Sequence, residues 1–178
     1  MRRTVLVHLS CGAMPVSTIV LPSAAELDRG ELLGELGRRG VRVVDVDLPS
    51  AHPAPFATRV CAAIGAARPA GGFIVVVPPA SVGALPAVAL AQRSARRRVI
   101  GYAILEPGLI NARDVPTGLD WPDAPVTCLS VRVAEPAWVG LRGWHGLTLA
   151  SLSEVASVLA RWDETTSFPG ADAIDEFG

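Results

Sequence analysis

An unbroken run of apolar, mostly β-branched residues near the middle of the chain is the strongest structural signal in the sequence. This run, Phe73–Val77, is far too short for a membrane span and fits a strand buried on both faces of a sheet. A turn of prolines and small residues follows at Pro78–Gly83. After it, an Ala/Leu-rich segment that reaches about Arg96 suits a buried helix. The pattern predicts a central strand that turns sharply into a helix.

Strand-like and helix-like segments alternate along most of the chain, and the helical ones repeat their apolar residues at the spacing of one helix face. The predicted strands are Ser17–Leu21, Val41–Leu48, Phe73–Val77, Arg98–Leu105 and Pro125–Val133, with Thr4–Leu9 as a weaker edge strand. The predicted helices are Glu26–Arg39, Phe56–Ala67, the segment up to about Arg96, and Ser153–Trp162 capped by Ser151 or Ser153. This alternation predicts the α/β class, with a mostly parallel sheet and helices on both faces.

The C-terminal part of the pattern is less regular. Ala137–Leu141 fits either a short last strand or the approach to Trp144-His145-Gly146. Residues 1–165 are expected to form a single domain, and the small, acidic residues 166–178 a flexible tail. Ligands of parallel sheets bind where the strands end, so a site is expected in the loops that follow the strands. These loops are Pro22–Glu26, Pro49–Pro55, Pro78–Gly83, Glu106–Asn111, Val133–Pro136 and Gly143–Leu147.

Composition argues against several classes of protein. The 178 residues carry a formal net charge of -1 and include no lysine, which rules out the phosphate-binding lysine of a P-loop. No Gly-x-Gly-x-x-Gly follows the first strand. The basic run Arg96–Arg98 ends a predicted helix, where cations favour the helix dipole. A solvated helix end is therefore a better interpretation than a phosphate or nucleic-acid contact, and no nucleic-acid partner is expected.

Cysteine usage and the lengths of the apolar runs bear on compartment and cofactors. Cys11, Cys61 and Cys128 are widely spaced and form no metal-ligand pattern, so each is expected to act as a small buried hydrophobe. The lack of a disulfide framework favours a reducing cytoplasm. No apolar run is long enough to cross a bilayer, so no membrane partner is expected. No motif calls for a metal or an organic cofactor.

The order of these features resembles the α/β-hydrolase superfamily over about residues 17 to 163. The stretches that carry the resemblance are Ser17–Ser23, Gly40–Pro49, Pro79–Gly83, Val99–Leu109 and Gly143–Gly146. The chain is most similar to small, cap-poor hydrolase-like proteins of actinobacteria, some of which serve natural-product pathways. The resemblance implies a reduced α/β-hydrolase fold. Because no length remains for a lid domain, it also implies a pocket that is open or completed by a partner, with a homodimer as one arrangement.

The resemblance further implies a serine nucleophile, a histidine base and an acid that orients the base. Ser81 lies in the turn between the central strand and its helix, where the family places its nucleophile. His145 stands where the family places its base, in a turn just before the last helix. Glu106 is the preferred acid and Glu135 the alternative, since each follows a strand that can carry it. More distant candidates for the acid are Asp114, Asp120 and Asp123.

The same resemblance implies an oxyanion hole and substrate contacts. Backbone N–H groups of Ser23 or Ala24, together with that of Val82, are the candidate donors, because an oxyanion hole needs two aimed donors rather than particular side chains. His52, between prolines on the same rim, and Trp144 are the candidate substrate contacts. For both histidines, a structural role in a loop is the competing interpretation.

The turn departs from the family pattern Gly-x-Ser-x-Gly, since Pro79 replaces the first glycine and lacks an N–H. Counted from the central strand, the nucleophile position falls on Ala80 rather than Ser81; counted back from Pro86, it falls on Pro79. Two functions stay open. One is serine-dependent acyl transfer on a small or carrier-bound ester or thioester, as in an esterase, thioesterase or acyltransferase. The other is a lapsed or repurposed hydrolase fold that binds a small apolar ligand or a partner, or performs non-covalent cyclisation or isomerisation.

Overall fold

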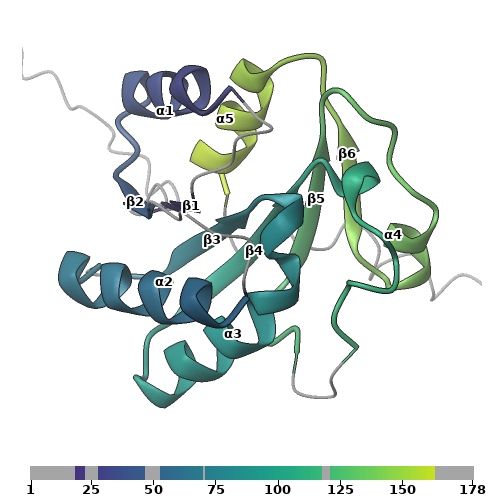
Figure 1. Ribbon diagram of the computed structural model, residues 1–178. Helices are drawn as coiled ribbons and strands as arrows, with labels where there is room; N and C mark the ends of the chain where they lie inside the picture. The colour runs from purple at the N-terminus through teal and green to yellow at the C-terminus, as the bar shows by residue number, and fades with distance from the viewer. Residues whose placement is uncertain (1–18, 23–27, 47–52, 70, 118–120, 163–178) are drawn as a thin grey trace, which may run out of the picture.

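The computed structural model describes residues 19–22, 28–46, 53–69, 71–117 and 121–162. The strands in these ranges form one six-stranded sheet in the order β2-β1-β3-β4-β5-β6, and every neighbouring pair is parallel (Figure 1). The strands are β1 (Ile19–Pro22), β2 (Val43–Val46), β3 (Phe73–Val77), β4 (Val99–Leu105), β5 (Val126–Ser130) and β6 (His145–Thr148). The predicted α/β class with a parallel sheet is confirmed.

Helices cover both faces of this sheet. They are α1 (Arg29–Arg38), α2 (Pro53–Ala67), α3 (Leu85–Ser94), α4 (Trp138–Leu141) and α5 (Leu152–Ala160). Figure 1 shows α1 and α5 together on one side of the sheet and α2 and α3 together on the other. The guanidinium of Arg39, just after α1, donates to the hydroxyl groups of Ser153 and Ser157 on α5, which ties the first pair of helices together.

The central strand β3 explains the unbroken apolar run of the sequence. All five of its residues are fully buried. Phe73, Val75 and Val77 pack in the cluster shared with α2 and α3, while Ile74 and Val76 pack in the cluster shared with α1 and α5. Because side chains alternate between faces of a strand, a strand covered on both faces needs apolar residues at every position.

The C-terminal part of the sheet decides between the two alternatives for Ala137–Leu141, in favour of an approach to Trp144-His145-Gly146. Ala137–Leu141 is not a strand: α4 is a single helical turn there, closed by hydrogen bonds from the Arg142 N–H to the Trp138 and Val139 carbonyls. Gly143, with a φ of 68°, reverses the chain after it, and β6 begins at His145. Four or five apolar residues satisfy either period, so the burial of Val139 against the sheet decides the outcome.

Other boundaries agree more closely with the pattern. The N-terminus of α5 is capped by Ser151, whose hydroxyl accepts the N–H of Glu154, as predicted for one of two serines. Helix α2 begins at Pro53, earlier than expected, inside the segment read as a proline-rich loop. Proline suits a first helical turn because its missing N–H would have no partner there. The predicted strand Thr4–Leu9 and the predicted tail at 166–178 lie outside the described residues.

Cysteine and membrane expectations can be compared with the described part of the chain. Cys128 is buried, Cys61 is half-buried, and both are free thiols; Cys11 lies outside the described residues. Burial is the main cause that raises the pKa of the Cys128 thiol to about 12, and the nearby Glu135 carboxylate adds to it. Among the described residues, no cluster of metal-ligating side chains occurs. None of the described helices has the length and apolar character needed to traverse a membrane.

Candidate functional site

The turn that follows β3 is a continuous 3-10 helix rather than a strained elbow. Pro78 is extended, with a ψ of 165°, and Pro79–Ala84 forms the 3-10 helix that runs directly into α3. The Ser81 N–H donates to the Pro78 carbonyl. No residue of this turn has a positive φ, whereas the nucleophile of a hydrolase elbow is held in a strained backbone conformation. The two prolines hold their own φ negative and so favour the helical path.

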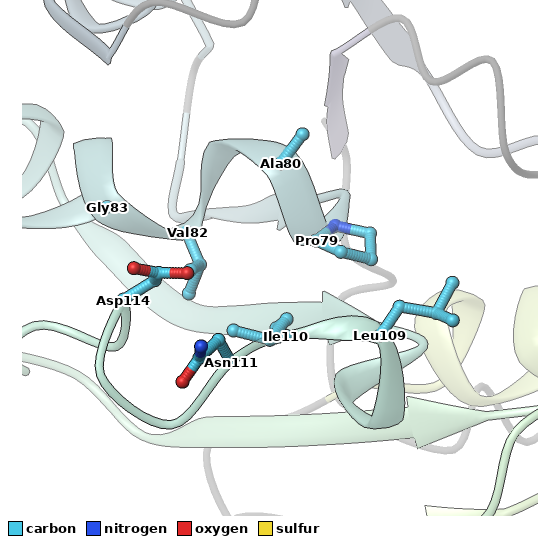
Figure 2. A pocket seen from close by; sticks show the side chains of 8 residues that line it. All are labelled: Pro79, Ala80, Val82, Gly83, Leu109, Ile110, Asn111 and Asp114. Atoms are coloured by element: carbon cyan, nitrogen blue, oxygen red, sulfur yellow. The ribbon is translucent and has the colours of Figure 1, made fainter.

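A cavity of about 400 Å³ lies at the carboxyl edge of the sheet, beside this turn. It is bounded by the segments that follow β3 and β4, as Figure 2 shows. The lining residues are Pro79, Ala80, Val82, Gly83, Leu109, Ile110, Asn111 and Asp114. Ala80 is among the lining residues and Ser81 is not. The Ala80 methyl group points away from Val82 and Asp114 (Figure 2), so Ala80 borders the cavity without projecting its side chain into it.

His145 lies far from the turn. It is the first residue of β6, and the register places it level with Thr127 of β5 and, through β4, with Val76 of β3. Three strand spacings separate β6 from β3, which corresponds to roughly 14 Å between the backbones. The expectation that His145 occupies the turn before the last helix is corrected: that turn is Leu149–Ser151 and contains no histidine. The structure does not bring Ser81 and His145 together.

Glu106 is buried at the end of β4, and its carboxylate is already occupied. It accepts the N–H groups of Val131, Arg132 and Val133 at 3.0–3.1 Å, with Arg132 also 3.3 Å from the second oxygen. The residue itself adopts a left-handed conformation, with φ 47° and ψ 57°. Its side chain is 2% exposed. The preferred acid therefore holds the loop after β5 in place and is not directed toward His145.

Glu135, the alternative acid, lies beside β6 on the wrong face for His145. A Cβ added to Gly146 would come within 1.7 Å of a Glu135 carboxylate oxygen, so this glycine leaves the room that the carboxylate occupies. Neighbouring residues of a strand point to opposite faces. The side chain of His145 therefore points away from the face on which Glu135 lies. The two groups do not form a base–acid pair in this arrangement.

Trp144 packs in an aromatic cluster instead of lining the cavity. Its ring meets those of Trp121 and Trp138 edge-on, with centroids 5.3 and 5.9 Å away, and Trp121 in turn meets Tyr102. The Arg142 guanidinium lies 5.4 Å from the centre of the Trp144 ring. Three tryptophans and the single tyrosine of the chain thus brace the β4–β6 end of the sheet.

The remaining candidate residues fall into two groups. Val82 and Asp114 both line the cavity, and Val82 is also part of the buried core. Asp123 accepts a 2.7 Å hydrogen bond from the buried Tyr102 hydroxyl, and so supports the aromatic cluster. Candidates outside the described residues are Ser23, Ala24, His52 and Asp120.

Asn111 is the cavity residue whose role the sequence did not reveal, although its loop was among those expected to hold a site. Its side-chain oxygen accepts the Arg113 N–H at 3.1 Å, an Asx-type turn that leaves the amide nitrogen as a donor. Asp114 follows in the same turn, its N–H donating to the Asn111 carbonyl. The adjacent pattern Asn-x-x-Asp after a strand end was the available signal.

The arrangement of strands and helices matches known hydrolase-type structures. The structure of RedJ with a PEG molecule bound in the active site is similar, with a TM-score of 0.55, 14% identity, and coverage of 90% of this chain and 96% of that one. The structure of the RedJ thioesterase from the prodiginine biosynthetic pathway in Streptomyces coelicolor is similar at a TM-score of 0.53 and 15% identity, covering 85% and 82%. The fold is of the α/β-hydrolase type. No protein-family model and no curated protein sequence matches the chain.

This likeness bears on the fold expectation drawn from the sequence. Five of the six strands in the sheet overlap strands predicted from the sequence, and β6 was not predicted. The turn after β3 is the one in which the resemblance led us to expect the nucleophile. At 14–15% identity the likeness establishes the fold alone. The function has to be argued from the side chains of this chain.

Proposed function

We propose that this chain binds a small, largely apolar acyl-type ligand non-covalently in the cavity at the carboxyl edge, on a hydrolase fold that has lost the acyl-enzyme step. The observation that carries the proposal is the turn after β3, which is a 3-10 helix with no residue in the strained conformation of an elbow. The separation of Ser81 from His145, and the occupation of Glu106 by backbone donors, also support it.

The lining of the cavity suits such a ligand. Pro79, Leu109 and Ile110 offer apolar surface, and at about 400 Å³ the volume falls within the range of small-molecule sites, roughly 300–1,000 Å³. The Asn111 amide nitrogen is positioned to donate to a carbonyl. The Asp114 carboxylate, which makes no hydrogen bond or ion pair with the described residues, can accept from a ligand N–H or O–H. The cavity surface is mixed in polarity, so it suits a ligand that carries an acyl carbonyl beside its apolar part.

Serine-dependent hydrolysis or transfer of a thioester is the second candidate. It is favoured by the likeness to the RedJ thioesterase and by Ser81, which is one residue from the cavity wall and partly exposed. In this mechanism the Ser81 hydroxyl attacks the thioester carbonyl and the thiol leaves. It would require a base other than His145, because His145 lies three strands away.

One experiment separates the two candidates. The protein is incubated with a fluorophosphonate probe and analysed by intact mass, and in parallel with octanoyl-N-acetylcysteamine while binding and thiol release are followed. Non-covalent binding predicts no adduct, no thiol release and saturable binding. Gly83→Phe should fill the cavity, because a Cβ at Gly83 would lie 3.9 Å from the Asp114 carbonyl on the facing wall, and it should weaken binding at least tenfold. Ala87→Phe, on the exposed side of α3, should not weaken binding. An adduct at Ser81 that disappears in Ser81→Ala would establish the serine mechanism instead.

A further inference from the structure

A second cavity, of about 300 Å³, lies at the amino ends of the strands, whereas the proposed ligand site lies at their carboxyl ends. It is formed where α2 leads into β3 and where α3 leads into β4, so it sits at the amino ends of these two strands. The lining residues are Pro69, Gly71, Gly72, Phe73, Arg96, Arg97 and Arg98. Among the described residues, three arginines line it and no carboxylate does.

The surrounding sequence is strongly segregated in charge. Residues 48–105 contain six of the sixteen arginines and none of the seventeen acidic residues of the chain. The whole chain is nearly neutral, at -1, so the positive charge of this stretch is balanced only by segments elsewhere. Figure 1 shows α2 and α3, which belong to this stretch, side by side on one face. The resulting field favours an anion at the cavity.

The backbone conformation at the cavity is a second, independent observation that points to a ligand. In the described part of the chain, three residues other than glycine have a positive φ, and two of them are Arg68 (45°) and Arg96 (53°). Arg96 occupies the position after α3 where its N–H bonds to the Arg93 carbonyl and the Arg97 N–H bonds to the Gln92 carbonyl. Glycine is the usual residue at this point of such a motif. An arginine held in a conformation that glycine adopts more easily points to a use for its side chain.

The side chains are arranged to receive an anion. The Arg97 guanidinium is anchored by a bond to the Cys61 carbonyl at 3.3 Å and lies against Gly65 of α2. The Arg96 side chain is exposed and makes no hydrogen bond or ion pair with the described residues. A Cβ added at Gly71 would meet no described atom within 4 Å, so the cavity is open to a ligand on the Gly71 side. One anchored and one unengaged guanidinium suit bidentate contacts to a phosphate.

We propose that this cavity binds the phosphate group of a small molecule, with Arg96 and Arg97 as the principal contacts. This site is separate from the ligand cavity at the carboxyl ends of the strands. If the protein does not bind phosphate, the proposed function is therefore unaffected. The alternative role for the arginines, neutralising the C-terminal ends of α2 and α3, requires only charge near the helix ends and no bound anion.

Titration calorimetry with inorganic phosphate, against chloride at equal ionic strength, tests the proposal. The wild-type chain should bind phosphate saturably. Arg96→Gly should lower the phosphate affinity at least tenfold while its thermal midpoint stays equal or rises, because glycine relieves the positive φ. The matched control Arg161→Gln, an exposed arginine at the end of α5, should bind as the wild type does.

Either of two results in the phosphate titrations would overturn the proposal, and a third result, from a competition experiment, would contradict it. One is the absence of saturable phosphate binding above the chloride baseline. The other is an equal affinity in Arg96→Gly, Arg161→Gln and the wild type, which would assign the arginines to helix-end stabilisation. Binding of a single-stranded oligonucleotide without competition by inorganic phosphate would also contradict it, because the contact would then be an extended basic surface and not this cavity.

Discussion

Removing the carboxylate of Glu106 should release the loop that follows β5. Three backbone N–H groups, those of Val131, Arg132 and Val133, depend on this one side chain. Hydrogen bonds to a charged group contribute about 1.5–3 kcal/mol each, but Arg132 is exposed and water can replace part of the loss. We therefore expect Glu106→Ala to lower the free energy of unfolding by about 3 kcal/mol.

The intermediate substitutions sharpen this expectation. Glu106→Gln keeps one acceptor oxygen and turns an NH₂ group toward donors, so it should cost about 2 kcal/mol. Glu106→Gly loses the same three bonds as alanine but relieves the left-handed backbone, so it should be about 1 kcal/mol more stable than Glu106→Ala. The control is Glu135→Ala, since the Glu135 side chain accepts no hydrogen bond from the described residues.

Urea unfolding followed by circular dichroism measures the stabilities, and hydrogen exchange reports the amides of residues 131–133 directly. These amides should exchange faster in Glu106→Ala and be unchanged in Glu135→Ala. If Glu106→Ala loses less than about 0.5 kcal/mol and the exchange of the three amides is unaltered, the carboxylate does not hold the loop.

Three further perturbations test other contacts. Burial is the main cause that raises the pKa of Tyr102, the single tyrosine of the chain. The stabilising effect of its neutral form is therefore present below about pH 10 and is lost as the pH rises further. Tyrosinate absorbance should appear together with unfolding, and Tyr102→Phe should reduce the loss of stability at alkaline pH. The Cys128 thiol, with its pKa raised to about 12, should resist iodoacetamide at pH 8 in the folded protein and react in urea, as site-resolved mass spectrometry would show; rapid native alkylation would contradict its burial. Gly101→Ala should cost about 2 kcal/mol because a Cβ would lie 2.5 Å from the Trp162 ring, whereas Gly37→Ala, with nothing within 4 Å, should stabilise α1 by about 0.5–1 kcal/mol; equal thermal midpoints would refute the packing argument.

Much of the fold follows from local pattern. The apolar run of β3, the amphipathic helix α5 and its serine cap are readable in the sequence because each depends on residues close together in the chain. The short elements were less readable. A strand of four residues at His145–Thr148 and a helical turn at Trp138–Leu141 differ too little in pattern, so their pairing with β5 and their packing decide which is which.

The candidate site divides in the same way. The sequence by itself determined that an α/β sheet would place a proline-rich turn and the Glu106–Asn111 loop at one edge, because parallel strands end at a common edge. Only the tertiary structure decided which side chains meet there. Ala80 and Asp114 line a cavity, while Glu106 is engaged by a loop 25 residues further along the chain. His145 lies at the start of an outer strand, three strands from the turn. Such partnerships depend on strand order and register, which join residues far apart in the chain and leave no local pattern to read.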